Sequence, residues 1–174
     1  MLPDTSSLLA CVGASLVLAL TPGPAAGQAQ ERSNPFGDPF VQVTSGLAGC
    51  PVPAGPLFTP EQVREEAHGR AQRGVSCHMA GRCRLPSSYL YDKEIVPRVV
   101  IATRYAGRFA DTSVWTLGQA RIVTLMGCVQ SAAQSRDLES LIGNIDDVEG
   151  VVNYLMVGTS GTPGYELARP VARN

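Results

Sequence analysis

The sequence predicts a protein of mixed α/β class whose C-terminal half folds as one small domain. Three observations carry this prediction: an apolar stripe of helical period at residues 95–103, two alternating segments joined by a short turn at 112–129, and a second helical stripe followed by the apolar run "VVNYLMV". The chain has 174 residues, of which 44% are hydrophobic, which is enough for one core with appendages. The formal net charge of -1 gives no overall electrostatic case for nucleic acid or for an acidic substrate.

Residues 1–29 have the pattern of a secretory signal peptide. The apolar run "LLACVGASLVLAL" is too short to span a bilayer comfortably, and it is followed by the helix-breaking, small-residue stretch "TPGPAAGQAQ". We therefore predict export, with cleavage after Ala29. Two alternatives are an uncleaved membrane anchor and lipidation at Cys11, although a lipobox needs its apolar run before the cysteine and here the run follows it.

The chain that remains after cleavage contains four cysteines, Cys50, Cys77, Cys83 and Cys128. In an oxidising compartment they are expected to form disulfides, and four cysteines allow three pairings. Closing the short loop "CHMAGRC" by Cys77–Cys83 would leave Cys50 to pair with Cys128, which is the pairing that we favour.

The same region allows a second interpretation as a metal site. His68, Cys77, His78 and Cys83 are zinc-type ligands within a short span. Cys77 and His78 are adjacent, however, and no C-x-x-C pair is present to bring two ligands to one ion. The disulfide interpretation is therefore preferred, and no metal or cofactor is predicted.

The N-terminal part of the exported chain divides into two segments. Residues 30–58 are punctuated by Pro and Gly, which predicts a flexible segment without a helix. Residues 59–91 form an extension made of a helix and the cysteine loop. The helix has a good start, with Thr59 as N-cap, Pro60 at the first helical position and Gln62 completing a capping box, and it is expected to end by Gly74.

Charge is unevenly distributed between this extension and the C-terminal half. The segment from Arg70 to Arg84 has four Arg and no acidic residue, whereas the segment from Arg136 to Glu149 has one Arg and five acidic residues. These can be two solvated faces. Alternatively, the basic segment contacts an anionic partner, such as a lipid headgroup layer, or packs on the acidic helix of its own chain.

Residues 92–158 follow the order helix, strand, strand, helix, strand. Asp92 is a candidate cap for a first helix whose apolar stripe includes Ile95 and Val99, and Pro97 interrupts that helix. "TSVWTLG" and "RIVTLMGCV" form a hairpin, and Ser131 with Gln134 caps a second helix that Gly150 ends before the last strand. The tail at 159–174 has no periodicity and is expected to be flexible.

These residues resemble a BON domain, a small module of bacterial periplasmic and envelope proteins. The matching features are the opening "DKEI" helix, the strand "VTLMG" with Gly127 at the position of the family's hallmark glycine, and the closing "VEGVVNYLMV" with Gly150. The resemblance implies an αββαβ domain with a three-stranded sheet and two helices on one face. The chain departs from the family in Pro97, in Cys128 and in carrying a single copy.

Gly127 also has an interpretation that does not depend on the family. A glycine within a strand weakens it, so its presence indicates a bulge or a close approach by another group. Packing against the neighbouring helix is the simpler explanation, and contact with a ligand is the alternative.

The resemblance implies a periplasmic protein that binds rather than catalyses. Its expected ligand is an anionic phospholipid or membrane surface, and Arg98, Arg104 and Arg108, on or near the first helix of the domain, are the candidate contacts. No catalytic residues are predicted, because the sequence shows no nucleophile–base pair, nucleophile elbow or phosphate-binding loop. The alternative is a structural or adaptor subunit that docks on an envelope protein through the Arg-rich cysteine loop from Cys77 to Arg84.

Overall fold

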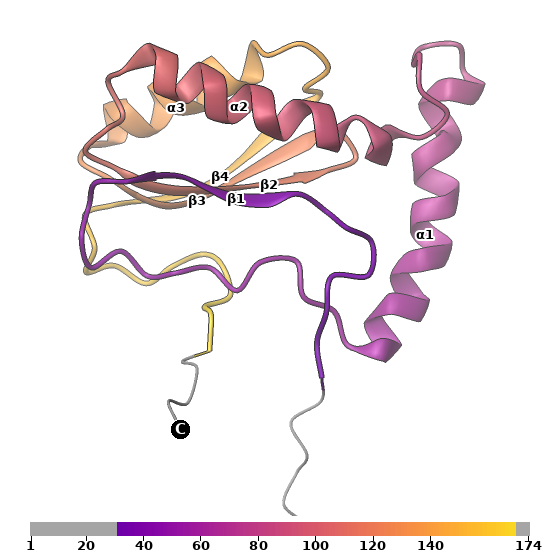
Figure 1. The fold of residues 1–174 in the computed structure, drawn as a ribbon, viewed down its shortest axis with the longest axis horizontal. Helices are drawn as coiled ribbons and strands as arrows, with labels where there is room; N and C mark the ends of the chain where they lie inside the picture. Colours follow the sequence, from indigo (N-terminus) through magenta and orange to yellow (C-terminus); the bar gives the residue numbers. More distant parts are fainter. Residues whose placement is uncertain (1–30, 170–174) are drawn as a thin grey trace, which may run out of the picture.

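A computed structural model describes residues 31–169 of the chain, and the predicted signal peptide lies outside them. The fold is mixed α/β, with one four-stranded sheet and, in the described part, three α-helices (Figure 1). No helix within residues 31–169 is long and apolar enough to cross a bilayer. The elements in chain order are β1 Phe40–Ser45, α1 Pro60–Met79, the 3₁₀ turn η1 Ser88–Leu90, α2 Asp92–Ala106, β2 Ser113–Gln119, β3 Ile122–Val129, α3 Ala132–Gly143 and β4 Gly150–Val157.

The sheet has the strand order β1-β2-β3-β4. β2 and β3 form the predicted antiparallel hairpin, whose two-residue turn, Ala120 and Arg121, has positive φ angles of 55° and 71°. β4 pairs with β3 in parallel, and α3 forms the crossover between them. The predicted order of elements over residues 92–158 is therefore confirmed.

The prediction of a three-stranded sheet is wrong, because β1 adds a fourth strand antiparallel to β2. β1 lies inside the Pro/Gly-rich segment that the sequence predicts to be flexible. It is six residues long and lies between Pro39 and Gly46, so it has too few alternating positions to stand out. It is a strand because it pairs with β2, and the local sequence pattern gives no sign of that pairing.

The main core lies between α2, α3 and one face of the sheet (Figure 1). Ile95 and Val99 of α2 and Leu138 of α3 are fully buried there, as their helical spacing predicts. Full burial of each aliphatic side chain is worth roughly 1.5–3 kcal/mol. Pro97 is tolerated because it lies on the exposed side of α2, where water can bond the carbonyl that it leaves without an intrahelical partner. α3 ends at Gly143 rather than at Gly150, which instead begins β4.

The opposite face of the sheet is covered by two extended segments, residues 46–58 and 159–169, which run side by side beneath it (Figure 1). The sequence predicts a flexible tail; in the structure the backbone N–H of Ala54 donates to Glu166 O, and that of Ala168 donates to Val52 O, both over 2.8 Å. The predicted disulfide Cys50–Cys128 is confirmed and fixes the first segment to β3. Because it joins residues 78 apart in the sequence, it raises the free energy of the unfolded chain by about 4.5 kcal/mol in the chain-entropy account.

α1 stands at one end of the sheet and begins with the predicted Thr59 capping box. It runs past Gly74 to Met79, so the predicted end is wrong. Gly74 is present because the chain packs closely against it: a Cβ there would lie 2.6 Å from Ser87 Oγ. α1 has few apolar residues. Its Arg70 is buried, donates to both carboxylate oxygens of Asp38 over 2.7 and 2.6 Å, and lies 4.0 Å above the Phe36 ring.

Gly127 lies in β3 with a φ of 124°, which side chains rarely adopt. A Cβ at this position would lie 2.1 Å from the carbonyl oxygen of Ser113 in β2. The glycine is therefore required by close approach of the neighbouring strand, and not by packing against a helix. It is a structural residue of the hairpin.

Candidate functional site

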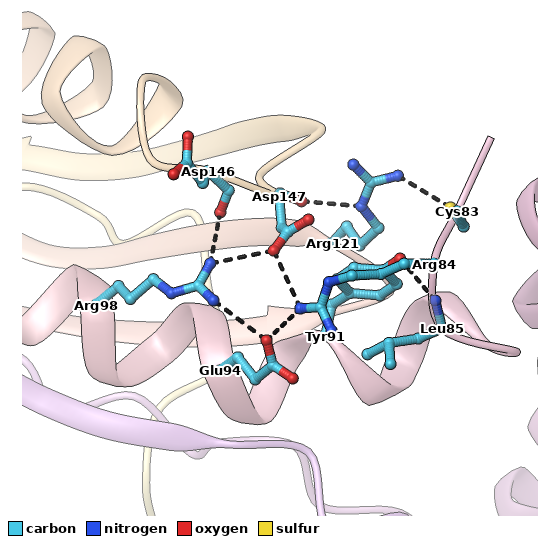
Figure 2. A network of polar contacts seen from close by, with 9 residues as sticks. All are labelled: Cys83, Arg84, Leu85, Tyr91, Glu94, Arg98, Arg121, Asp146 and Asp147. Carbon is cyan, nitrogen blue, oxygen red and sulfur yellow. Dashed lines mark hydrogen bonds and ion pairs between the residues drawn. The ribbon is translucent and has the colours of Figure 1, made fainter.

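The three arginines predicted to contact a ligand lie along or just after α2, but the structure does not bring them together as one group. Arg98 lies in the middle of the helix, Arg104 in its last turn, and Arg108 just beyond its end. The two halves of α2 have different neighbours. The N-terminal half faces the cysteine loop and the α3–β4 connection, and the C-terminal half does not (Figure 2).

Arg98 is engaged within the chain. Its Nη1 lies 3.1 Å from Asp147 Oδ2, and its Nη2 lies 3.1 Å from Glu94 Oε2, one helical turn earlier (Figure 2). Nη1 also donates to the carbonyl of Asp146. Two carboxylates thus neutralise Arg98, so the prediction that it contacts a ligand together with Arg104 and Arg108 is not supported by its surroundings.

Arg84, at the end of the cysteine loop, joins the same network. It forms ion pairs with Glu94 and, over 3.4 Å, with Asp147, and its guanidinium lies 4.9 Å from the centre of the Tyr91 ring (Figure 2). Asp147 belongs to the acidic segment that the sequence singles out. Asp147 lies beyond the end of α3, so Arg84 contacts the acidic segment after the helix, and the alternative that the basic segment packs on the acidic helix itself is not confirmed.

The electrostatics of Asp147 follow from these contacts. Partial burial alone would raise the pKa of its carboxyl, but hydrogen bonds from Arg98 and Arg84 outweigh that effect and hold the pKa below its ordinary value. Its backbone has a positive φ of 72°, and its carbonyl accepts a bond of 2.9 Å from Arg121 Nε. Asp147 therefore links the α3–β4 connection to α2, to the hairpin turn and to the cysteine loop.

The predicted disulfide Cys77–Cys83 is confirmed, and it closes the loop that Arg84 directly follows. The zinc alternative is wrong, since both sulfurs are used in the disulfide. The two histidines have other neighbours: His78 Nδ1 lies 3.1 Å from the carbonyl oxygen of Cys83, and His68 Nε2 lies 3.2 Å from Gln72 Nε2.

Asp92 has a different role from the predicted helix cap. Tyr91 occupies the cap position, and the Asp92 carboxylate instead accepts the backbone N–H groups of Ala120 and Arg121 over 2.7 and 2.8 Å. It thereby holds the hairpin turn, with its two positive φ angles, against the start of α2. Burial raises the pKa of Asp92 to about 6, although the two N–H groups act in the opposite direction.

The C-terminal half of α2 presents a different surface, which we call the basic–apolar face: Ile101, Arg104, Tyr105 and Arg108. Ile101 is 67% exposed and Tyr105 is 94% exposed, one helical turn apart. Arg104 and Arg108 are exposed, and within residues 31–169 neither forms an ion pair. Arg108 lies 4.9 Å from the centre of the Phe109 ring, and Arg104 is favoured where it stands by the negative end of the helix dipole.

Sequence reasoning found the two arginines of this face and missed Ile101 and Tyr105. A signal was available, because these are large residues that fall off the buried stripe of α2 and follow each other at a spacing of four. An exposed aromatic and an exposed aliphatic side chain beside two cations are suited to contact a partner surface that is anionic on its outside and apolar beneath.

Comparison with known proteins gives no family for this chain: no family model, no curated protein and no solved structure matches it. The BON resemblance therefore stays a prediction from the residues quoted for it.

Proposed function

We propose that the protein is an exported, non-catalytic protein that binds the surface of anionic phospholipid membranes through the basic–apolar face. The observation that carries the proposal is the exposure of Ile101 and Tyr105 beside Arg104 and Arg108, which form no ion pairs in the described chain. The BON resemblance supports the same function. The two disulfides are compatible with an oxidising compartment such as the periplasm.

The expected affinity can be bounded. A cation near an anionic membrane surface contributes about 1 kcal/mol, so Arg104 and Arg108 together supply about 2 kcal/mol. Partial insertion of Ile101 and Tyr105 adds roughly 1–1.5 kcal/mol each. The sum of about 4–5 kcal/mol corresponds to a dissociation constant between about 0.2 and 1 mM, which describes reversible and salt-sensitive attachment.

The alternative, docking on an envelope protein through the loop from Cys77 to Arg84, has less support. Arg84 is paired with Glu94 and Asp147 within the chain, so its charge is already balanced. Arg82 and Met79 are exposed in this loop region and could still meet a partner. No contact in the structure favours that use over solvent exposure.

The experiment is co-sedimentation with vesicles of phosphatidylglycerol at low salt, repeated with neutral phosphatidylcholine vesicles. We expect binding to the anionic vesicles only, weakening as salt is added. The double variant Ile101→Ser/Tyr105→Ser should bind roughly 30-fold more weakly, as expected for about 2 kcal/mol of lost insertion. Met79→Ser removes another exposed apolar side chain, at the end of α1, and serves as the matched control.

Two results would contradict the proposal. One is the absence of binding to anionic vesicles at low salt. The other is equal binding by the wild type and by Ile101→Ser/Tyr105→Ser. If Met79→Ser were the variant that loses binding, the region around the cysteine loop would replace the basic–apolar face as the contact surface.

A further inference from the structure

A hollow of about 330 Å³ opens at the C-terminal end of α2, beside the basic–apolar face. One wall comes from β1 and the turn after it, and the other from the end of α2 and the chain that follows. Arg104 belongs both to this lining and to the basic–apolar face. The lining residues are Val43, Thr44, Ser45, Gly46, Thr103, Arg104, Gly107, Phe109 and Ala110.

Thr103 is the unusual residue of this lining. It is 1% exposed, and its hydroxyl is buried without a hydrogen-bond partner. A buried hydroxyl without a partner destabilises a fold, and most are paired. Among the described residues, the only other buried hydroxyl without a partner is that of Thr116 in β2, which does not line the hollow.

The rest of the lining is mainly apolar. Val43, Phe109 and Ala110 offer hydrocarbon, and Arg104 supplies a cation that no carboxylate of the described chain neutralises. The volume lies at the lower end of the range for small-molecule sites, so it suits a segment of a ligand rather than a large one. A ligand that matches this lining has an anionic group, then a hydrogen-bond acceptor, and then a short hydrocarbon segment.

We infer that the hollow is a binding site for a single anionic lipid. The phosphate of the lipid pairs with Arg104, and an ester carbonyl accepts a hydrogen bond from the Thr103 hydroxyl. The first part of one acyl chain lies among Val43, Phe109 and Ala110. This inference rests on the proposed function and deepens it, because the protein would recognise one lipid molecule in addition to adsorbing on a charged surface.

The test uses a lipid in monomeric form. Isothermal titration calorimetry with lysophosphatidylglycerol below its critical micelle concentration should show saturable binding at one site. Thr103→Val keeps the shape of the side chain and removes the hydroxyl, so it should raise the dissociation constant roughly three- to tenfold. The matched control Thr116→Val removes the other unpaired buried hydroxyl and should leave the dissociation constant unchanged.

Both variants should unfold at the same temperature as the wild type or higher, since each removes a buried polar group without a partner. A weaker affinity of Thr103→Val therefore could not be assigned to lost folding. Glycerophosphoglycerol, which has the headgroup without a chain, separates the lipid from its phosphate and should bind much more weakly than the lysolipid.

Equal lysolipid affinity in the wild type and in Thr103→Val would overturn the inference, and so would headgroup binding as tight as that of the lysolipid. If anionic vesicles sediment the protein while the monomeric lysolipid does not bind, the hollow is excluded and the surface function stands. If neither binds, the proposed function itself fails.

Discussion

The two halves of α2 show how differently the same side chain can be used on one helix. Arg98 in the N-terminal half is held between Glu94 and Asp147, whereas Arg104 in the C-terminal half has no ion pair in the described chain. Their separation along the helix does not explain this difference, because they are less than two turns apart. The difference comes from Asp147, which the α3–β4 connection places beside Arg98 and which has no counterpart beside Arg104 among the described residues.

The neighbours of the N-terminal half explain its structural role. Asp147 comes from the α3–β4 connection, and Arg84 directly follows the loop that Cys77–Cys83 closes, so two other parts of the chain meet this half of α2. The C-terminal half instead presents Ile101 and Tyr105, which are exposed. The N-terminal half therefore joins elements of the fold, and the C-terminal half is available to bind.

Charge reversal in the C-terminal half should give the largest effect. Arg104→Glu/Arg108→Glu changes the charge of the face by four units, which at about 1 kcal/mol per unit removes nearly all of the expected binding free energy, so co-sedimentation with phosphatidylglycerol vesicles should be lost. Arg64→Glu, on the exposed side of α1, is the matched control and should reduce binding only slightly. An equal loss in Arg98→Gln would show that the two halves act alike.

Removing the acidic partners should convert the N-terminal half into a second basic surface. In Glu94→Gln/Asp147→Asn the charges of Arg84 and Arg98 are no longer balanced, so vesicle binding should tighten roughly tenfold at low salt. The free energy of unfolding should fall by about 1–2 kcal/mol, because exposed ion pairs stabilise a fold only weakly. Vesicle titration and urea denaturation measure the two effects, and unchanged binding would mean that pairing does not keep this half from the membrane.

The fold of residues 92–158 could be predicted because its signals are local. The stripe of Ile95 and Val99, the alternating hairpin and the Ser131 cap each depend on residues within one element. β1 could not be predicted in the same way, because a six-residue strand between Pro39 and Gly46 is defined by its pairing with β2. The continuation of α1 through Gly74 likewise depends on Ser87, which packs there from another part of the chain.

The candidate site was predictable in part for the same reason. Sequence position places Arg98, Arg104 and Arg108 on or next to one helix, and that prediction is confirmed. It cannot show which of them meets a carboxylate, because Asp147 is 49 residues away from Arg98 along the chain and is brought near by the crossover of α3. The role of Asp92 was missed on similar grounds, since the turn that it holds is formed by residues 120 and 121.

The last prediction concerns Asp92 and sharpens the structural role of the N-terminal half. Burial raises the pKa of this carboxyl to about 6, above its ordinary value, while the unfolded chain retains the ordinary value. The native state therefore binds more protons than the unfolded state between about pH 4 and pH 6. Its stability is greatest below this window, falls as the pH rises through it, and levels off above pH 7.

Between pH 5 and pH 7 this carboxyl should lower the free energy of unfolding by about 1 kcal/mol, out of about 3 kcal/mol over its whole titration. The charges that act on it, Asp38 and Arg70, are paired with each other, and Asp147 titrates below the window because its pKa is lowered. Urea denaturation at pH 5 and pH 7 measures the slope. Asp92→Asn should remove it, whereas Asp137→Asn on the exposed side of α3 should keep it. If the stability of Asp92→Asn still depended on pH between pH 5 and pH 7, another group would be the one that titrates. The contact between α2 and the hairpin turn would then have no electrostatic role.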